Sequence, residues 1–506
     1  IGLEKANTVA LIMENSPSFL FVTFGMAKIG VTVALINHNL VGKPLAFSMK
    51  QTGCRLAVFD HSTADGLREF ANPDALPLFY YSAEAAAVPS FATQLDPSAH
   101  AATAPDKSAR KDVAVTDTAF HIFTSGTTGL PKAARINHLR ATMNGFAMLT
   151  FQRVTPSDRV YVTLPLYHSS AMLIGVFGCM AHGIPLLLRR KFSARSFFAD
   201  CAAMDATVCL YIGELLRFLV ATPPGEYDTA HRVRLAIGNG LRPDVWDKFQ
   251  KRFGVGAIGE FYGSTEGNAS LINNQNRLGA MGYISPLIAF KYPVKIVKFD
   301  VESETVVRNE AGQCIEVRPG EAGELVGLIN DTDLTRRFDG YTDGAATEKK
   351  ILRDVLKPGD KYFRTGDLVR QDAEGFIYFV DRIGDTYRWK GENVSTAEVG
   401  EVLSCAPGVT QATVYGVSVP HVEGRAGMAS IVAEDDDAFS LESLYARCAA
   451  DLPKYAQPLF VRRQAELEIT GTFKNRKVAL VEEGFDPARV AGDALFMRDD
   501  AKKSFV

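Results

Sequence analysis

A stretch of small hydroxyl and glycine residues lies between two apolar runs and ends in a single lysine. It reads HIFTSGTTGLPKAARINH over residues 121–138. Backbone N–H groups in a glycine-rich loop form a concavity for anions, and Ser and Thr hydroxyls add donors that suit phosphate oxygens. We therefore expect this segment to hold a phosphate chain. The alternative is an ordinary surface loop, since Gly, Ser and Thr are common loop formers.

The spacing differs from that of the P-loop of many nucleotide-binding proteins. Counting from Gly126, Lys132 keeps its place, but Pro131 stands at the second glycine of that motif. Ala133 stands where a Ser or Thr would bind magnesium. A metal ligand must therefore come from elsewhere in the chain.

A second segment, GEFYGSTEGN over residues 259–268, contains the missing groups. Tyr262 can lay its ring on a base, and Ser264 and Thr265 can donate to phosphate. Glu266 offers the carboxylate oxygens that magnesium prefers. A strand followed by a turn with a solvated glutamate would give the same pattern, so the segment by itself leaves both interpretations open.

The composition limits the partners of the protein. A formal net charge of −3 and a pI near 6.4 provide no sustained positive field, so we expect no nucleic-acid partner. Hydrophobic residues at 47% and charged residues at 22% are typical of a globular protein, and 506 residues predict at least two domains. Seven cysteines without a C-x-x-C spacing favour a reducing compartment over a disulfide framework or a zinc site.

Strand-like and helix-like segments alternate at the start of the chain. Residues 8–13, 31–36 and 56–59 predict buried strands with helices between them, which is typical of a parallel, doubly wound α/β sheet. Residues 82–112, rich in Ala, Pro and Ser, predict an exposed connector. The composition changes again near Asp381, where we expect a hinge near Gly384 and a small α+β domain after it.

One apolar run is a candidate for a membrane-spanning segment. Residues 160–188 contain no Asp, Glu, Lys or Arg and are long enough to span a bilayer. Pro165, His168 and the breaker Gly183–Pro185 interrupt the run, so we expect a strand, a loop, a short buried helix and a second strand. A membrane segment is the alternative.

Taken in order, several motifs resemble those of one enzyme superfamily. They are FTSGTTGLPKAA, EFYGSTEGN, YFRTGDLV, DRIGDTYRWKGENVSTAEV and TGTFK. Their order and rough spacing are similar to the adenylate-forming superfamily of acyl-CoA synthetases, luciferases and peptide-synthetase adenylation domains. The amino-acid sequences of these motifs are most similar to those of the branch of fatty acid transport proteins and very-long-chain acyl-CoA synthetases.

The resemblance implies a fold and a reaction. The fold is a large N-terminal domain with doubly wound mixed and parallel sheets, expected over residues 1–383, and a small mobile α+β domain over 384–506. The reaction implied is activation of a long or very long fatty acid with ATP and magnesium to acyl-AMP, followed by transfer to coenzyme A. The resemblance also implies fatty acid, ATP and coenzyme A as partners, with a location in the cytoplasm or peripherally on the cytoplasmic face of a membrane.

The resemblance also assigns roles to individual residues. The phosphate loop comprises Thr124, Ser125, Gly126, Thr127, Thr128, Gly129 and Lys132. Around the adenine and the α-phosphate lie Gly238, Asn239, Gly240, Tyr262, Gly263, Ser264 and Thr265, with Glu266 as the magnesium ligand. Asp367 and Arg382 match the ribose-binding pair, and Gly384 marks the hinge where many members carry Asp or Lys. Lys474 matches the adenylation lysine, although Phe473 precedes it where a glycine is usual.

The acyl pocket and the activity leave alternatives open. His168 matches a position near the entrance to the acyl site, and Tyr211 and Gly213 lie in an apolar segment that suits an alkyl channel. A satisfied buried histidine and an ordinary core would give the same pattern. The alternatives to a fatty acid ligase are a ligase for another hydrophobic acid (bile acid, carnitine-like), transfer to a carrier protein, and a fatty-acid uptake or binding protein at a membrane.

Overall fold

The computed structural model describes residues 2–71, 76–81, 87–96, 106–124, 131–301, 303–390, 392–420, 422, 424–434, 439–468, 477–490 and 492–506. The chain forms two compact units. The first unit comprises Ile1–Leu241, Lys248–Arg277 and Leu328–Leu352, and the second unit comprises Arg242–Asp247, Leu278–Gly327 and Arg353–Val506. Because Arg353–Val506 falls within one unit, this grouping does not separate the residues on either side of Gly384, and the predicted domain boundary there stays a prediction.

One sheet of the first unit confirms the predicted α/β pattern. Its strand order is β5-β4-β3-β1-β2-β6-β7, parallel from β5 to β6, with β7 antiparallel to β6. The strands are β1 (Thr8–Ile12), β2 (Thr32–Leu35), β3 (Cys54–Phe59), β4 (Leu78–Tyr80), β5 (Thr93–Gln94), β6 (Thr118–Thr124) and β7 (Lys132–Asn137). The helices are α1 (Pro17–Lys28), α2 (Gly42–Gln51), α3 (Ala64–Leu67), α4 (His138–Phe151) and α9 (Gly344–Glu348). Within the predicted connector at 82–112, both residues of β5 are exposed and Phe91 is partly buried against the core of this sheet, and its role as a connector stays a prediction.

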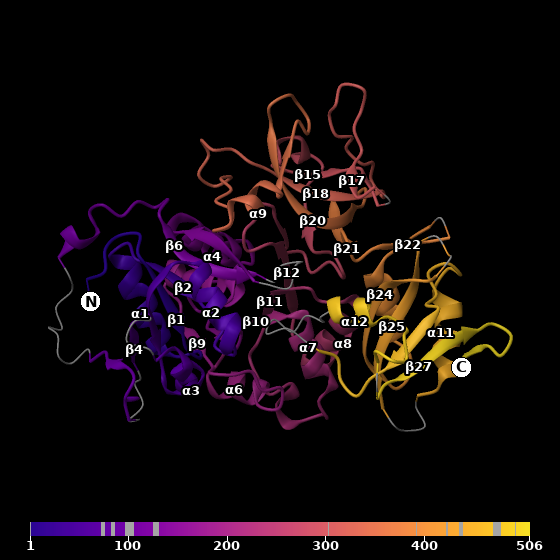
Figure 1. Cartoon of the computed structure of the whole chain (residues 1–506), viewed down its shortest axis with the longest axis horizontal. Helices are drawn as coiled ribbons and strands as arrows, with labels where there is room; N and C mark the ends of the chain where they lie inside the picture. Colours follow the sequence, from indigo (N-terminus) through magenta and orange to yellow (C-terminus); the bar gives the residue numbers. More distant parts are fainter. Residues whose placement is uncertain are drawn as a thin grey trace. The chain divides into compact units, whose positions relative to one another are not determined.

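The second sheet of this unit has the order β13-β12-β11-β10-β8-β9, parallel except for β13. Its strands are β8 (Val160–Val162), β9 (Leu186–Leu188), β10 (Val208–Ile212), β11 (Leu235–Asn239), β12 (Ala257–Gly263) and β13 (Ser270–Asn273). The helices along this part of the chain are the π-helix η5 (Ser170–Phe177), α5 (Gly178–His182), α6 (Phe197–Ala203), α7 (Gly213–Ala221) and α8 (Pro243–Phe253). Of these elements, Figure 1 labels β9, β10, β11, β12, α6, α7 and α8.

The apolar run at 160–188 divides as predicted. Strand β8, a loop, the buried helix η5 with α5, and strand β9 follow one another. Gly183 ends α5 with a left-handed φ of 65°, which stops the helix short of the next strand. In the part of the chain that the structure describes, no helix is long and apolar enough to cross a membrane.

The second unit contains a mainly antiparallel sheet and a C-terminal α/β sheet. The former has the order β14-β21-β20-β18-β15, with β19 beside β20, and the latter the order β24-β25-β26-β27-β28. Its strands are β14 (Gly282–Tyr283), β15 (Val294–Val297), β16 (Phe299–Asp300), β17 (Thr305–Val306), β18 (Ala322–Leu328), β19 (Ile351–Arg353), β20 (Lys361–Gln371), β21 (Phe376–Arg382), β22 (Tyr387–Trp389), β23 (Glu392–Val394), β24 (Val409–Ser418), β25 (Arg425–Ala433), β26 (Phe460–Arg463), β27 (Ala494–Asp499) and β28 (Ser504–Phe505). Its helices are α10 (Thr396–Ser404), α11 (Leu441–Asp451) and α12 (Val478–Glu483). Leu403 of α10 and Leu444 of α11 pack into the core of the C-terminal sheet.

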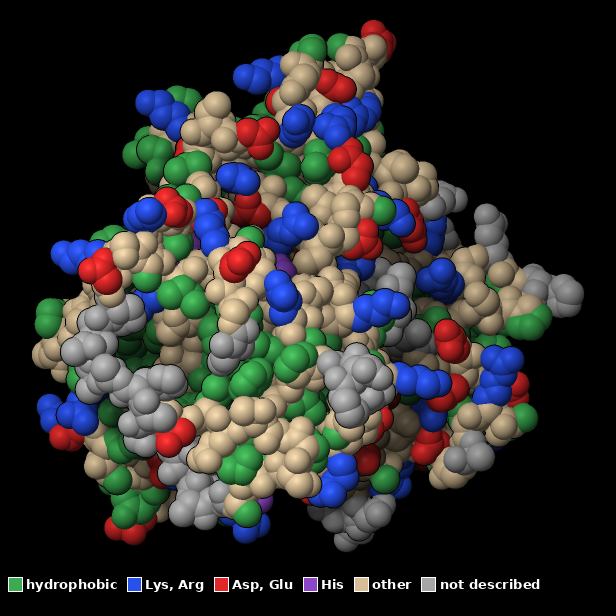
Figure 2. Space-filling view, turned by 60° about the vertical axis from the view of Figure 1, so that its left-hand side comes forward, with side chains coloured by type: hydrophobic (Ala, Val, Ile, Leu, Met, Phe, Trp, Pro, Cys, Tyr) green, Lys and Arg blue, Asp and Glu red, His purple; other side chains and the backbone are tan. Residues whose placement is uncertain are grey.

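The surface and the cysteines agree with the composition. On the face that Figure 2 shows, Lys and Arg side chains are interspersed with Asp and Glu side chains, as the formal net charge of −3 implies. All seven cysteines lie among the described residues and carry free thiols. Burial raises the pKa of Cys209 to about 12, so this thiol is a small apolar core group at neutral pH.

Candidate functional site

The two ends of the predicted phosphate loop lie side by side. Strand β6 ends at Thr124, strand β7 begins at Lys132, and the two residues are partners in the antiparallel register. The Thr124 hydroxyl donates to the Lys132 carbonyl oxygen at 3.4 Å. The hairpin therefore brings one hydroxyl residue and one cationic residue to the same end. Outside the described residues lie Ser125, Gly126, Thr127, Thr128 and Gly129, whose phosphate contacts stay predictions.

The loop that carries Glu266 is held by its backbone. It follows β12, and the Arg140 guanidinium of helix α4 donates to the carbonyl oxygens of Ser264, Glu266 and Gly267, at 2.9 Å for Glu266. The Asn268 side chain donates to two further carbonyls, those of residues 328 and 336, at 2.9 Å each. Burial lowers the pKa of Arg140, while the charge of Glu266 opposes this shift. Glu266, 7% exposed, thus lies in a loop whose path is fixed on both sides.

Thr265 lies next to the segment predicted to form the acyl pocket. Its hydroxyl is 3.0 Å from the hydroxyl of Ser169, which directly follows His168. His168 is half-buried, and its ring lies 4.3 Å from that of Tyr167, centroid to centroid. The structure therefore brings the predicted α-phosphate residue and the predicted acyl-entrance residue to adjacent positions at the start of η5. Whether His168 contacts an acid stays a prediction.

Tyr341 joins the two predicted anion-binding segments. Its phenol donates to Glu266 Oε1 at 2.7 Å. The Lys132 ammonium lies 5.7 Å from the centroid of the Tyr341 ring. One buried side chain therefore lies between Lys132 at the end of the phosphate loop and the Glu266 loop, which are far apart in sequence.

The donor set at Glu266 fits a magnesium ion. An ionised carboxylate has about four lone-pair positions, so the bond from Tyr341 leaves oxygen positions for a cation. Magnesium usually binds through one or two carboxylates together with phosphate oxygens of the substrate. Among the described residues no cluster of three or more His, Cys, Asp and Glu could hold a metal by itself. Glu266 together with nucleotide phosphates is thus the arrangement that these residues can support.

The predicted adenine turn packs tightly against the neighbouring chain at Tyr211 and Gly213. Strand β11 ends at Asn239, and Gly240 has a left-handed φ of 76°. A Cβ at Gly238 would lie 2.2 Å from the Tyr211 carbonyl oxygen, and one at Gly213 would lie 1.9 Å from the Gly240 carbonyl oxygen. Only glycine fits at these two places without a backbone shift.

Glu260 supports the same turn from within the core. Its carboxylate accepts a hydrogen bond from the Leu241 N–H at 3.1 Å and another from the Tyr211 hydroxyl. Burial raises the pKa of Glu260 to about 8. Tyr211 is fully buried beneath the turn, and Gly213 lies against it, so the structure places both next to the predicted adenine site. Their acyl-pocket role stays a prediction.

Tyr262 and Gly263 complete the first-unit part of the site. Both lie at the end of β12, beside the antiparallel strand β13, where Tyr262 pairs with Leu271. Tyr262 is half-buried and Gly263 is exposed, which leaves ring surface for stacking on a base.

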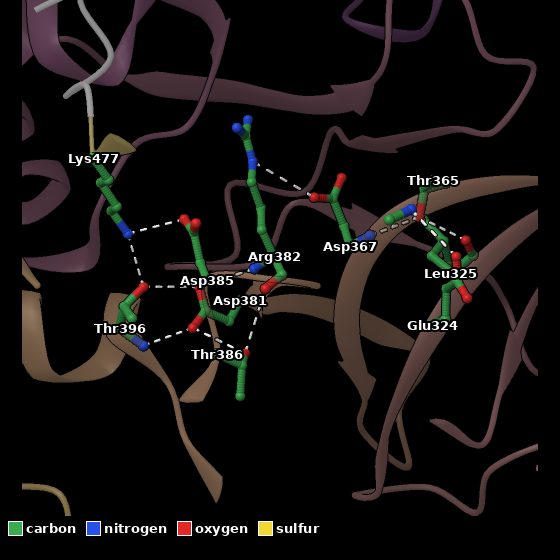
Figure 3. Close-up of polar contacts among 11 residues, drawn as sticks. Glu324, Leu325, Thr365, Asp367, Asp381, Arg382, Asp385, Thr386, Thr396 and Lys477 are labelled. Carbon is green, nitrogen blue, oxygen red and sulfur yellow. Dashed lines mark hydrogen bonds and ion pairs between the residues drawn. The ribbon is translucent and has the colours of Figure 1, made fainter. Parts of the chain in front are cut away.

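The predicted ribose-binding pair lies in the second unit. Asp367 of β20 and Arg382 of β21 are register partners, and Arg382 Nε lies 3.8 Å from Asp367 Oδ1 (Figure 3). The part of β20 before Asp367 is anchored by the buried Glu324, which accepts two bonds from the Arg364 Nε at 3.1 Å and one from the Gly366 N–H at 3.4 Å. The pair is therefore held at adjacent positions on two paired strands.

A polar network surrounds the predicted hinge. Gly384 has a φ of 94°, in the region that favours glycine. The buried Asp381 accepts from the Thr396 N–H at 2.6 Å, and Lys477 Nζ lies 2.9 Å from both Asp385 Oδ2 and the Thr396 hydroxyl (Figure 3). Burial raises the pKa of Asp381, and the positive charge of Lys477 opposes this shift. Outside the described residues lies Lys474, three positions before Lys477.

Three supporting residues were not predicted from the sequence: Arg140, Glu260 and Tyr341. Arg140 sits in an ordinary helical segment, and Tyr341 lies in the turn-rich segment FDGYTDG. Glu260 offered one signal, since a charged residue in the strand AIGEFYG is unusual in a buried position.

Two α/β sheets in the first unit and a C-terminal α/β sheet in the second give the architecture found in adenylate-forming enzymes. The chain belongs to the AMP-binding enzyme family: residues 1–326 match the AMP-binding enzyme model, and residues 398–474 match the AMP-binding enzyme C-terminal domain. It is 43% identical to long-chain fatty acid transport protein 2 of Rattus norvegicus, over 100% of this chain and 82% of that protein.

Solved structures have the same fold. ATP-bound MatB from Rhodopseudomonas palustris aligns with a TM-score of 0.76 at 23% identity, over 95% of this chain and 89% of that chain. A fatty acyl CoA synthetase of Mycobacterium tuberculosis aligns with a TM-score of 0.61 at 22% identity, over 95% and 88%. These similarities confirm the predicted architecture of sheets and C-terminal region.

Proposed function

We propose that the chain is an ATP-dependent acyl-CoA synthetase for long- or very-long-chain fatty acids. A carboxylate oxygen of the acid attacks the α-phosphorus of ATP, and pyrophosphate leaves. The sulfur of coenzyme A then attacks the carbonyl carbon of acyl-AMP, AMP leaves and the thiol proton passes to solvent. The products are acyl-CoA, AMP and pyrophosphate.

The observation that carries this proposal is the convergence of four groups within the first unit. Thr124 and Lys132 flank the loop, Thr265 and Glu266 lie on a second loop, and Tyr341, which donates to Glu266, lies with its ring 5.7 Å from the Lys132 ammonium. A cation, hydroxyl donors and a carboxylate are what a triphosphate with magnesium requires. The family membership supports the same interpretation.

Positioning and charge neutralisation supply most of the catalysis in such a reaction. Lys132 neutralises charge on the β- and γ-phosphates, and the Thr265 hydroxyl donates to the α-phosphate. Magnesium, when bound, withdraws charge from the phosphate oxygens and so favours departure of pyrophosphate. Glu266 supplies the protein oxygen for that ion.

The second unit provides the ribose and lysine contacts of the proposal. Asp367 accepts both ribose hydroxyls, because an ionised carboxylate is only an acceptor. Arg382, which is half-exposed and paired with Asp367, contacts the ribose as well. Lys474 bridges the attacking carboxylate and the α-phosphate, and a rotation about Gly384 withdraws it before coenzyme A reacts.

The choice of a long fatty acid is supported by the names of the relatives, a long-chain fatty acid transport protein and a fatty acyl CoA synthetase. Fatty-acid uptake is compatible with the same reaction, because conversion to acyl-CoA retains the acid on the side of the membrane where the reaction takes place. A protein that only binds or carries fatty acids would form neither acyl-AMP nor acyl-CoA.

The test is ATP–pyrophosphate exchange with acids from short to very long, with and without coenzyme A. We expect exchange with long acids and thioester formation when coenzyme A is added. Exchange with other hydrophobic acids alone would change the substrate. No exchange with any acid, in a folded protein that still binds fatty acid, would favour uptake or binding as the function.

A further inference from the structure

Tyr341 lies on an extra strand segment beside the phosphate-loop hairpin. Residues 340–342 pair with β7: the Arg135 N–H donates to the Gly340 carbonyl oxygen at 3.0 Å, and the Thr342 N–H donates to the Ala133 carbonyl oxygen at 2.9 Å. Gly340 has a left-handed φ of 67°, and a Cβ there would lie 2.3 Å from the Thr347 side chain. The backbone therefore fixes where the Tyr341 side chain starts.

The side chain of Tyr341 is also fixed. It is 4% exposed and packs with Ala134 and Ala346. From this position the phenol reaches Glu266 Oε1 at 2.7 Å, and the ring lies 5.7 Å from the ammonium of Lys132. One buried side chain thus hydrogen-bonds the carboxylate that suits magnesium and lies near the lysine that suits the phosphates.

We propose that Tyr341 is a positioning residue for the metal–nucleotide complex: its hydroxyl holds the Glu266 carboxylate in the orientation that binds magnesium, and its ring steadies Lys132 beside the phosphate loop. The inference rests on the proposed function, because it assigns magnesium to Glu266. A ligating carboxylate that is hydrogen-bonded loses rotational freedom, and mutation of such outer partners typically lowers metal affinity or activity 10–100-fold.

The phenol has one proton, and it donates this proton to Glu266 Oε1 at 2.7 Å. A phenylalanine would keep the ring beside Lys132 and remove only this donor, so Tyr341→Phe separates the two contacts.

The first measurement is the magnesium dependence of ATP–pyrophosphate exchange in Tyr341→Phe. We expect the magnesium concentration for half-maximal rate to rise roughly tenfold or more, while KM for the acid stays unchanged and the rate at saturating magnesium is largely retained. The matched control is Tyr80→Phe, a second buried tyrosine of the first unit, whose hydroxyl has no hydrogen-bond partner among the described residues. It should leave the magnesium dependence unchanged.

The second measurement does not depend on turnover. Mn²⁺ binding is followed by electron paramagnetic resonance with α,β-methylene-ATP, per folded protein, in the wild type, Tyr341→Phe, Glu266→Gln and the double variant. We expect weaker binding in Tyr341→Phe and little additional loss when it is combined with Glu266→Gln, because the hydroxyl acts through that carboxylate.

The outcomes separate this inference from the proposed reaction. Equal Mn²⁺–nucleotide binding by wild type and Tyr341→Phe, fully additive losses in the double variant, or a wild type that binds no metal–nucleotide complex would overturn the inference. A wild type that binds the complex, loses affinity in Tyr341→Phe and shows no exchange with any acid would refute the synthetase and retain the role of Tyr341.

Discussion

Replacing Gly213 by alanine tests whether this residue serves the adenine turn or the acyl pocket. An added Cβ would lie 1.9 Å from the Gly240 carbonyl oxygen. Ordinary contact between a carbon and a carbonyl oxygen begins at about 3.3 Å, so the two segments must separate by roughly 1.4 Å. The nearest atoms all belong to the backbone of Gly240 and Leu241, so no side-chain rotation can relieve the contact.

The size of the effect follows from this displacement. Overpacking of this kind costs about 1–3 kcal/mol of stability, and a misplacement of about 1 Å near a reacting substrate can lower the rate about 100-fold. We therefore expect kcat/KM for ATP to fall by roughly two orders of magnitude. The KM for the fatty acid should stay close to that of the wild type.

The assay is ATP–pyrophosphate exchange with ATP varied at saturating acid, and then with acid varied at saturating ATP. Gly25→Ala is the matched control, because Gly25 is an exposed glycine within helix α1 and a Cβ there meets nothing within 4 Å. This control should keep its kinetics and gain up to about 1 kcal/mol of stability from helix propensity.

The reasoning would be refuted by a specific pattern in Gly213→Ala. If the kinetics for ATP stay within about threefold of the wild type while KM for long acids rises, Gly213 lines the acyl pocket, as the sequence predicted. If kcat/KM for ATP falls and KM for long acids also rises, Gly213 contributes to both the adenine turn and the acyl pocket.

Further predictions concern the lysine, a buried carboxyl and the hinge. Lys474→Ala should abolish acyl-AMP formation and leave thioester formation from supplied acyl-AMP largely intact; equal loss in both half-reactions would contradict its role. Burial raises the pKa of Glu260 from 4.5 to about 8, so the folded protein holds a proton that the unfolded chain has released, and stability falls as pH rises through this window by up to about 1.4 kcal/mol per pH unit. Glu260→Gln should remove that slope, so its Tm relative to wild type should rise from pH 5 to pH 8, and parallel curves would speak against a buried proton. Gly384→Ala, placed at a φ of 94°, should slow thioester formation about tenfold or more relative to pyrophosphate exchange, since alanine resists this conformation by about 1–2 kcal/mol; equal rates would argue against a hinge there.

The elements of the fold were largely predictable because their signals are local. Short apolar runs between helical segments predict the strands at 8–13, 31–36 and 56–59, and the structure confirms them. Strand β5 was missed, because two exposed residues in an Ala- and Pro-rich segment carry no strand pattern. Likewise, the resemblance identified motif residues because each motif is contiguous.

The supporting residues were not predictable because their partners lie far away in sequence. Tyr341 reaches Glu266 across 75 positions, Arg140 reaches the same loop across 126, and Tyr211 reaches Glu260 across 49. No local spacing encodes such pairs. Their roles depend on how the sheets and helices of the first unit pack.

The backbone contacts of Arg140 bear on how this site can change during evolution. Because the guanidinium binds the carbonyl oxygens of Ser264, Glu266 and Gly267 rather than their side chains, these contacts do not require a particular side chain at those positions. Substitution of Glu266 can therefore alter the chemistry presented to a ligand while Arg140 still holds the backbone of the loop. A scaffold of this kind allows a lineage, or a protein engineer, to explore new side chains at the site without first rebuilding the fold.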